Sequence, residues 1–395
     1  MKYPKIKVSP ANYIWAMENS HVEEEKILRR FPKVQEWISG EDQPSMRELS
    51  IFSEITHIPL GYFFLNSPPT ESRELIAYRS LQNHPHDNPS KNLLDTIGLM
   101  INLQDFMREH SNFCESPKNK FTGSLIDYAR TLQKPLSMAK KIRKNLNVPL
   151  HWFNNKSEND INKNFNLIRS RIQDLDIMVM MNGFVGTNTR RKLSAQEFRA
   201  FTMLDDYAPL IFINANVAPF QRLFSLLYEL GHVALGVNDL YDNFTDKYDK
   251  LRDSTDRLCS AAASEILVPS EFFIDKWSEN KKGDNLEKVS NLAQFFQVDG
   301  LFLARRALDL KLLSPVEYTA ITRKAPSYFQ NMENNLFLNF YAKFFSGFDL
   351  NCLATIDSCV HSGELSYTEA YRLTGLNRTT FDKAMLLLQK GTKIP

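Results

Sequence analysis

The sequence has little of several features that would assign it to a class at once. Its formal net charge at neutral pH is only +2 over 395 residues, so no global positive field indicates nucleic acid or an anionic membrane surface. No segment offers 18 uninterrupted apolar residues, and the lysines between Met1 and Pro10 are not followed by the apolar stretch of a secretory signal. We therefore expect a cytoplasmic protein with no membrane partner.

Cysteine is also scarce. The chain has 4 cysteines, none of them in a CxxC pair, and Cys259 lies in an alanine-rich run where a buried free thiol is expected. This usage is typical of a reducing compartment. What is abundant is ordinary: 43% hydrophobic and 24% charged residues indicate a globular protein, long enough for two or three domains.

The order of apolar patterns predicts a mostly helical α+β protein. Short amphipathic helices are expected before residue 65, at the following positions: around Tyr13, 27–31, 34–38 and 46–55. Pro68 to Thr70 marks a linker, and helices follow over residues 90–165. These include a basic run that is best interpreted as a solvated helix face, made of Lys140, Lys141, Arg143 and Lys144.

The spacing of apolar residues along the chain changes after residue 166. Apolar or alternating runs predict a small antiparallel sheet, with a turn at Asn182-Gly183 and strands at 177–181, 198–204 and 210–213. Long helices resume at Pro219, and the stretch from Phe337 to Leu388 is helical again. There Ser366 and Glu369 form a candidate capping box, and Gly375 separates two short helices.

The most informative stretch is Tyr228-Glu229-Leu230-Gly231-His232, because it is the zinc-peptidase pattern HExxH without its first histidine. In the intact pattern, two imidazoles four residues apart on a helix bind Zn²⁺, and the glutamate is the general base for a metal-bound water. Proline at 219 and glycine at 236 bound a buried helix around it. By itself the remaining ExxH is weak, since a buried histidine satisfied by a hydrogen bond is the commoner case.

The surrounding sequence strengthens this interpretation. Several segments occur in a fixed order around the helix: 197–201, 205–209, 211–214 and 263–269. Together they resemble the ImmA/IrrE family of zinc metallopeptidases. Near the start, Trp37 and Gly40 followed by Pro44, Ser45 and Leu49 are similar to the helix-turn-helix domain of the Xre/Cro repressor class.

The resemblance implies a domain order. It implies an Xre-like helix-turn-helix domain over 1–69, a helical connector over 70–165, a zincin-like peptidase domain over 166–330 and a helical region over 331–395.

The resemblance also implies a metal site. Zinc would lie among the positions occupied by Tyr228, His232 and Asp256, with Glu229 as the base, so that two of the three ligand positions depart from the family pattern. A phenol with a pKa near 10 must lose its proton before it binds a metal. Aspartate is a methylene shorter than glutamate, so its helix must approach more closely or leave a water between the carboxylate and the metal.

Two outcomes remain open. If a metal binds, His232 and Asp256 hold the ion and Glu229 takes a proton from the metal-bound water. If none binds, Tyr228 hydrogen-bonds His232 or Asp256 in a pocket that no longer binds metal. We expect impaired or lost hydrolysis, hence a metallopeptidase-like regulator that acts through a repressor-like or antitoxin-like partner protein. The alternatives are an active endopeptidase that cleaves such a partner and the toxin-like component of a toxin-antitoxin pair.

DNA is a further expected partner. Arg29, Arg30 and Lys33 are the candidate contacts, although residues 1–50 hold as many acids as Lys and Arg and so lack a strong positive footprint. Xre-type helices also serve as dimerisation or partner-docking units, so a homodimer or a docked partner protein is an alternative role for this region.

Overall fold

The computed structural model describes residues 5–20, 24–56, 58, 60–67, 89–128, 134–150, 152, 161–236, 249–280, 284–328 and 340–390. The chain divides into two units, one made of residues 1–75 and 84–98 and the other of residues 76–83 and 99–395. The linker expected at Pro68 to Thr70 lies outside the described residues, and the four domain boundaries proposed from the sequence stay predictions. No helix in the described ranges has the length and apolar character needed to cross a bilayer.

The first unit is a cluster of short helices around an aromatic core. Its elements are α1 (Pro10–Ser20), α2 (Glu24–Arg30), α3 (Val34–Ser39), α4 (Met46–Thr56) and the 3-10 helix η1 (Leu60–Phe64). The helices expected from the sequence are confirmed. Tyr13 is fully buried, and its ring centroid lies 5.9 Å from those of Trp37 and Phe52. Such contacts stabilise the core beyond simple area burial.

Local signals set the ends of these helices. Gly40 ends α3 with a positive φ of 82°, a conformation that glycine adopts without steric cost. Ser45 and Glu48 form a reciprocal cap at the start of α4. The Glu48 carboxylate accepts hydrogen bonds from the backbone N–H and hydroxyl of Ser45, both at 2.7 Å, and the Glu48 N–H donates to the Ser45 hydroxyl at 3.3 Å.

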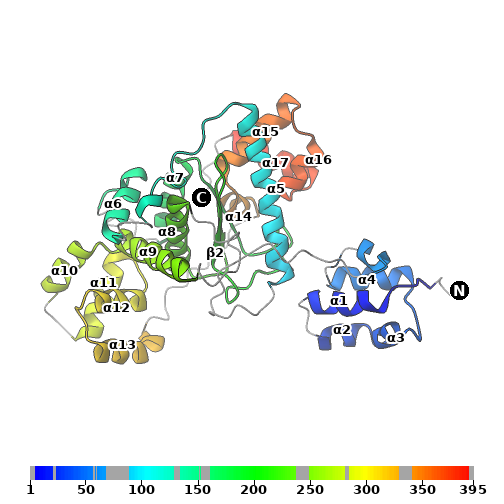
Figure 1. Cartoon of the computed structure of the whole chain (residues 1–395), viewed down its shortest axis with the longest axis horizontal. Coiled ribbons are helices and arrows are strands. Elements are labelled where there is room, and N and C mark those ends of the chain that lie inside the picture. Colours follow the sequence, from blue (N-terminus) through cyan, green and yellow to red (C-terminus); the bar gives the residue numbers. More distant parts are fainter. Residues whose placement is uncertain are drawn as a thin grey trace. The chain divides into compact units, whose positions relative to one another are not determined.

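The elements that follow include a small three-stranded sheet with helices packed on it (Figure 1). They are α5 (Lys91–Phe113), α6 (Pro135–Asn145), α7 (Ile161–Gln173), β1 (Met178–Asn182), β2 (Ala200–Met203), β3 (Leu210–Asn214), α8 (Pro219–Leu235), α9 (Asp249–Leu267), α10 (Ser270–Glu279), α11 (Asn285–Phe296), α12 (Gly300–Asp309), α13 (Pro315–Tyr328), α14 (Phe340–Gly347), α15 (Leu350–Ser362), α16 (Tyr367–Thr374) and α17 (Arg378–Gln389). The α+β, mostly helical class expected from the sequence is confirmed.

The sheet corrects one expectation. Its order is β1-β3-β2, with β3 antiparallel to β2 but parallel to β1, so the sheet is mixed and not antiparallel throughout. The Asn182-Gly183 turn does not make a hairpin, because residues 183–199 carry the chain to the far edge and β3 then enters the centre. All residues of β3 are buried, as expected for an apolar run covered on both faces.

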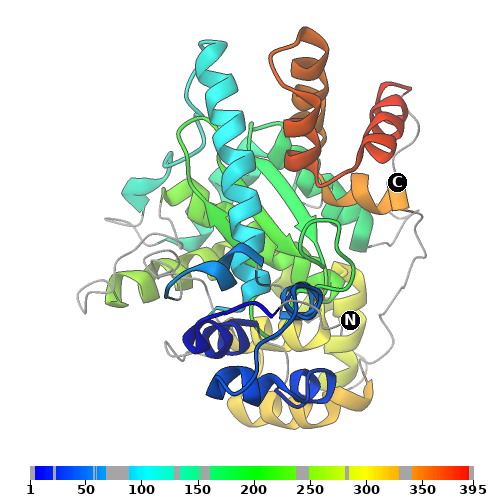
Figure 2. The same cartoon turned by 90° about the vertical axis from the view of Figure 1, so that its right-hand side faces the viewer.

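Helices cover both faces of this sheet. Figures 1 and 2 show α8 on one side and the second half of α5 on the other. On the α5 side, the Gln104 amide donates to the carbonyls of Met203 at 3.0 Å and Ala208 at 2.9 Å. Met203 is the last residue of β2, and Ala208 lies shortly before β3. The Gln104 side chain on α5 therefore supplies hydrogen-bond donors to carbonyls at the ends of these strands.

The C-terminal helices are joined to the sheet through buried charges. The Asp349 carboxylate caps α15 by accepting from Cys352 N at 3.0 Å, and it also accepts from Val179 N at 2.9 Å. Arg169 on α7 donates to the carbonyls of Val179 at 2.9 Å and Phe348 at 2.8 Å. Burial lowers the pKa of Arg169 to about 10. These bonds compensate the cost of burying both ions.

Two further expectations have clear outcomes. The Ser366–Glu369 capping box is present at the start of α16, and Gly375 ends that helix with a φ of 69°. The basic run on α6 is solvated at its three lysines, but the prediction is wrong for Arg143. Arg143 is buried and donates to the Glu265 carbonyl on α9 at 3.3 Å, because α6 packs this face against α9.

The Ser45–Glu48 cap gives a testable prediction. Its hydrogen bonds lower the pKa of Glu48, so their contribution is present above the ordinary value of 4.5 and is lost as pH falls through the lower folded value. At neutral pH, Ser45→Ala should destabilise the start of α4 by about 1 kcal/mol. Hydrogen exchange of the α4 amides measures this loss. Ser50→Ala, the same change later in α4, should leave exchange unchanged; equal effects would contradict the cap.

Candidate functional site

The candidate site is built on α8, whose ends are well defined. Pro219 occupies the first turn and Gly236 ends the helix with a φ of 66°, as the sequence predicts. Two C-terminal carbonyls are satisfied from another segment: Val233 O accepts from Gly123 N at 2.9 Å, and Ala234 O accepts from Leu125 N at 2.7 Å. The helix is buried from Ser225 to Leu235, so its side chains hold fixed positions.

Close packing of α9 on α8 brings the two halves of the site together. A Cβ added to Gly231 would lie 3.0 Å from the Cys259 sulfur and 3.2 Å from its Cβ. Ala262 and Ala263 are buried farther along α9. Small side chains at this contact allow the close approach that a short carboxylate on α9 requires.

Three of the residues singled out from the sequence meet at this contact. The Asp256 carboxylate lies 3.5 Å from Nε2 of His232, and the ring centroids of Tyr228 and His232 are 4.7 Å apart. Tyr228 and His232 are fully buried, whereas the Asp256 side chain is 25% exposed. The Asp256 oxygen that faces His232 is buried, so solvent reaches only the rest of this side chain.

Glu229 is anchored to the sheet. Its carboxylate accepts a hydrogen bond from the Thr202 hydroxyl on β2 at 2.7 Å, and both side chains are buried. Thr202 was not singled out from the sequence. A threonine between Phe201 and Met203 in an apolar strand is the available signal, but only the strand register shows that it faces α8.

The residues fit a zinc ion only in part. Two atoms bonded to one tetrahedral zinc are about 3.3–3.6 Å apart, which matches the spacing of His232 and Asp256. In the part of the chain that the structure describes, however, no third histidine, cysteine or carboxylate ligand atom joins this pair. The third protein ligand position of the family pattern is occupied by the phenol of Tyr228. The set is therefore incomplete for an ordinary zinc centre.

A second group of metal-binding residue types lies elsewhere, and no sequence pattern predicts it. His110 on α5 approaches Cys359 on α15, with Nδ1 3.4 Å from the sulfur, and Glu364 completes a group whose ligand atoms lie within 4.8 Å of one another. Burial, and then the Glu364 carboxylate, raise the pKa of the Cys359 thiol. The two helices are far apart in sequence, so no local spacing could predict their meeting.

The candidate DNA contacts lie in the first unit. Arg29 and Arg30 are exposed in the last turn of α2, and Lys33 is exposed just before α3. The Lys33 ammonium lies 3.5 Å from the Asp42 carboxylate, which also binds Lys5. An acid therefore offsets part of the positive charge around Lys33.

The contact at Gly231 can be tested directly. Gly231→Ala should destabilise the protein by about 1–3 kcal/mol, because the added methyl group pushes against Cys259. Removing the sulfur with Cys259→Ala should reduce the cost of Gly231→Ala, a coupling seen as non-additive free energies of unfolding in urea.

The matched control is Gly98→Ala on α5, where an added Cβ has nothing within 4 Å. This change should be neutral or stabilising by up to about 1 kcal/mol. If Gly231→Ala behaves like Gly98→Ala, the close approach of α9 is not what shapes the site.

Comparison with known proteins agrees with this geometry. Residues 172–308, which include α8 and α9, match the model of the IrrE N-terminal-like domain, and residues 354–385 match a domain of unknown function (DUF8813). The chain is 35% identical over 69 residues to the radiation response metalloprotease IrrE of Deinococcus deserti. That stretch is 17% of this chain and 25% of the relative, so the chain spans about a quarter of the curated relative it matches. Residues 172–308 thus carry an IrrE N-terminal-like domain, as the resemblance to the ImmA/IrrE family implies.

Proposed function

We propose that this protein is a metallopeptidase-like regulator in which zinc-dependent hydrolysis is impaired or lost and which acts through a partner protein. The observation that carries the proposal is the composition of the α8–α9 contact. His232 and Asp256 meet at 3.5 Å, but the Tyr228 ring stands where the family pattern has an imidazole.

The phenol weakens metal binding for a definite reason. A neutral imidazole binds zinc without losing a proton, whereas a phenol with a pKa near 10 must be deprotonated first. The buried ring of Tyr228 packs against His232, so it occupies the volume that the missing imidazole would fill. Bound zinc would supply an activated water. With two ordinary ligands, this site holds zinc weakly at neutral pH.

The other residues of the proposed catalytic site remain close to one another. Glu229 occupies the base position of the family pattern and is fixed by Thr202, and the partly exposed Asp256 lies beside His232. A group of side chains arranged in this way suits recognition of a partner segment without cleavage. The alternative, an active endopeptidase that cleaves a repressor-like or antitoxin-like partner, requires that the same three residues bind zinc tightly.

The proposal includes a DNA-directed or partner-directed role for the first unit. Arg29 and Arg30 are exposed at the end of α2, which suits contact with phosphates. Acidic residues in this unit offset its basic residues, so its affinity for DNA is modest. A partner protein or a second copy of the chain would strengthen DNA binding.

Restoring the missing imidazole tests the main proposal. Tyr228→His should gain a single tightly bound zinc ion per chain relative to the wild-type protein, measured by elemental analysis after equilibrium dialysis at neutral pH. Tyr228→Phe, which removes the hydroxyl without adding a ligand, should not gain zinc. Because the readout is a difference between variants, metal bound elsewhere on the chain does not affect it.

His232→Ala decides the alternative. The proposal expects the same zinc content in wild-type protein and in His232→Ala. A loss of one zinc ion per chain in this variant would show that the wild-type site is loaded and would favour the active endopeptidase.

The DNA-directed role has its own test. Arg30→Ala should weaken binding of the full chain to duplex DNA and lower the salt dependence of log K by about one phosphate contact. The matched control is Arg190→Ala, an exposed arginine in the second unit, which should leave both quantities unchanged. Equal effects of the two changes in an electrophoretic shift titration would argue against a DNA contact at α2.

A further inference from the structure

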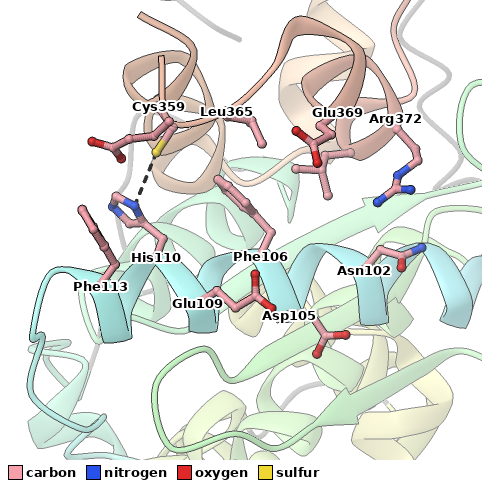
Figure 3. A pocket seen from close by; sticks show the side chains of 12 residues that line it. Asn102, Asp105, Phe106, Glu109, His110, Phe113, Cys359, Leu365, Glu369 and Arg372 are labelled. Atoms are coloured by element: carbon pink, nitrogen blue, oxygen red, sulfur yellow. Dashed lines mark hydrogen bonds between the residues drawn. The ribbon is translucent and has the colours of Figure 1, made fainter. Parts of the chain in front are cut away.

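The group formed by His110, Cys359 and Glu364 lies apart from the α8–α9 site. It lies at one end of a cavity of about 540 Å³ between α5 and the C-terminal helices (Figure 3). His110 and Phe106 point from α5 toward Cys359 and Leu365 on the facing segment. The ring centroids of Phe106 and His110 lie 6.4 Å apart in a stacked arrangement, which orients the imidazole on its helix.

The geometry around the imidazole orients both of its nitrogens. Nδ1 lies 3.4 Å from the Cys359 sulfur, and Nε2 lies 3.6 Å from the Cys114 sulfur on the opposite edge. An Nε2–H that donates toward Cys114 leaves the Nδ1 lone pair directed at Cys359. This is the tautomer that a metal at Nδ1 requires, with the partner on the other nitrogen holding the ring in place.

The donor set itself selects a class of ion. A thiolate, an imidazole and a carboxylate suit zinc and similar divalent transition metals, whereas magnesium and calcium prefer oxygen ligands throughout. Cys359 is buried, His110 is half-buried and Glu364 is exposed, so the group runs from the core to the cavity edge. Three protein ligands leave one tetrahedral position open for water.

We propose that His110, Cys359 and Glu364 bind a zinc-class divalent ion that joins α5 to the segment of α15 and α16. On binding, the Cys359 thiol releases its proton to solvent and the thiolate bonds to the metal, with no change in oxidation state. The ion closes a loop between residues 249 positions apart in the chain, so it stabilises the docking of the C-terminal helices. This site is independent of the fate of the α8–α9 pocket.

Cobalt reports on the proposal directly, because a cobalt–thiolate bond gives a charge-transfer absorption in the near ultraviolet. The full chain, stripped with chelator under reducing conditions, should develop this band on titration with Co²⁺ and lose it when Zn²⁺ is added. Cys359→Ser should abolish the band. Glu364→Gln, at an exposed position, should keep the fold and weaken affinity by at least about tenfold.

Two controls separate this site from its neighbours. Cys114→Ser should retain the band because Cys114 contacts the nitrogen that does not bind metal, and His232→Ala should retain it because the α8–α9 site is not involved. Hydrogen exchange in α15 and α16 should slow when Zn²⁺ is added to wild-type protein and not when it is added to Glu364→Gln.

Three results would overturn the proposal: no band in wild-type protein, a band that survives Cys359→Ser, or a band lost in Cys114→Ser alone. The first means that the group is held by thiol–imidazole hydrogen bonding only. If Cys359→Ser fails to fold by circular dichroism, His110→Gln and Glu364→Gln decide, since unchanged affinity in both would exclude the site.

Discussion

The close contact between α8 and α9 at Gly231 is the constraint on which the rest of the site depends. Without a side chain at Gly231, the Cys259 side chain packs directly against the α8 backbone, and Asp256, one turn earlier on α9, comes within 3.5 Å of His232. Any larger residue would separate the helices, and a short carboxylate would no longer reach. The glycine and the aspartate therefore fit each other, because the shorter side chain needs the closer helix.

In the function we propose, this arrangement keeps the layout of a zinc peptidase site and changes its chemistry. Glu229 remains anchored to β2 through Thr202, and His232 remains in place beside a carboxylate. In that proposal the Tyr228 ring stands in place of an imidazole ligand, and a phenol must lose a proton before it binds a metal. A fold of this kind keeps its packing when hydrolysis is impaired, because the substituted residue still fills its volume in the core. In the function we propose, this packing lets recognition of a partner persist without cleavage.

The C-terminal helices illustrate a second way in which this chain uses buried polar groups. Asp349 and Arg169 join β1, α7 and α15 through hydrogen bonds that satisfy their charges in the interior. His110 and Cys359 make fewer hydrogen bonds than Asp349 and Arg169, and they meet on the α5 side of the same helices. One interface is thus fixed by internal partners, and the other offers donor atoms to an ion. The difference is why we place a ligand at the second and not at the first.

The sequence by itself determined the mostly helical class, both ends of α8 and the Ser366–Glu369 cap, because periodicity, Pro219, Gly236 and this pair act over a few neighbouring positions. The residues of the α8–α9 site came from the resemblance to a family, with the ExxH spacing on α8 as the local signal. It could not determine the strand order, since a turn such as Asn182-Gly183 does not say which edge the chain reaches next. Only the tertiary structure decided that Thr202 holds Glu229 and that His110 meets Cys359. Such contacts depend on how distant elements pack, and no local pattern records that packing.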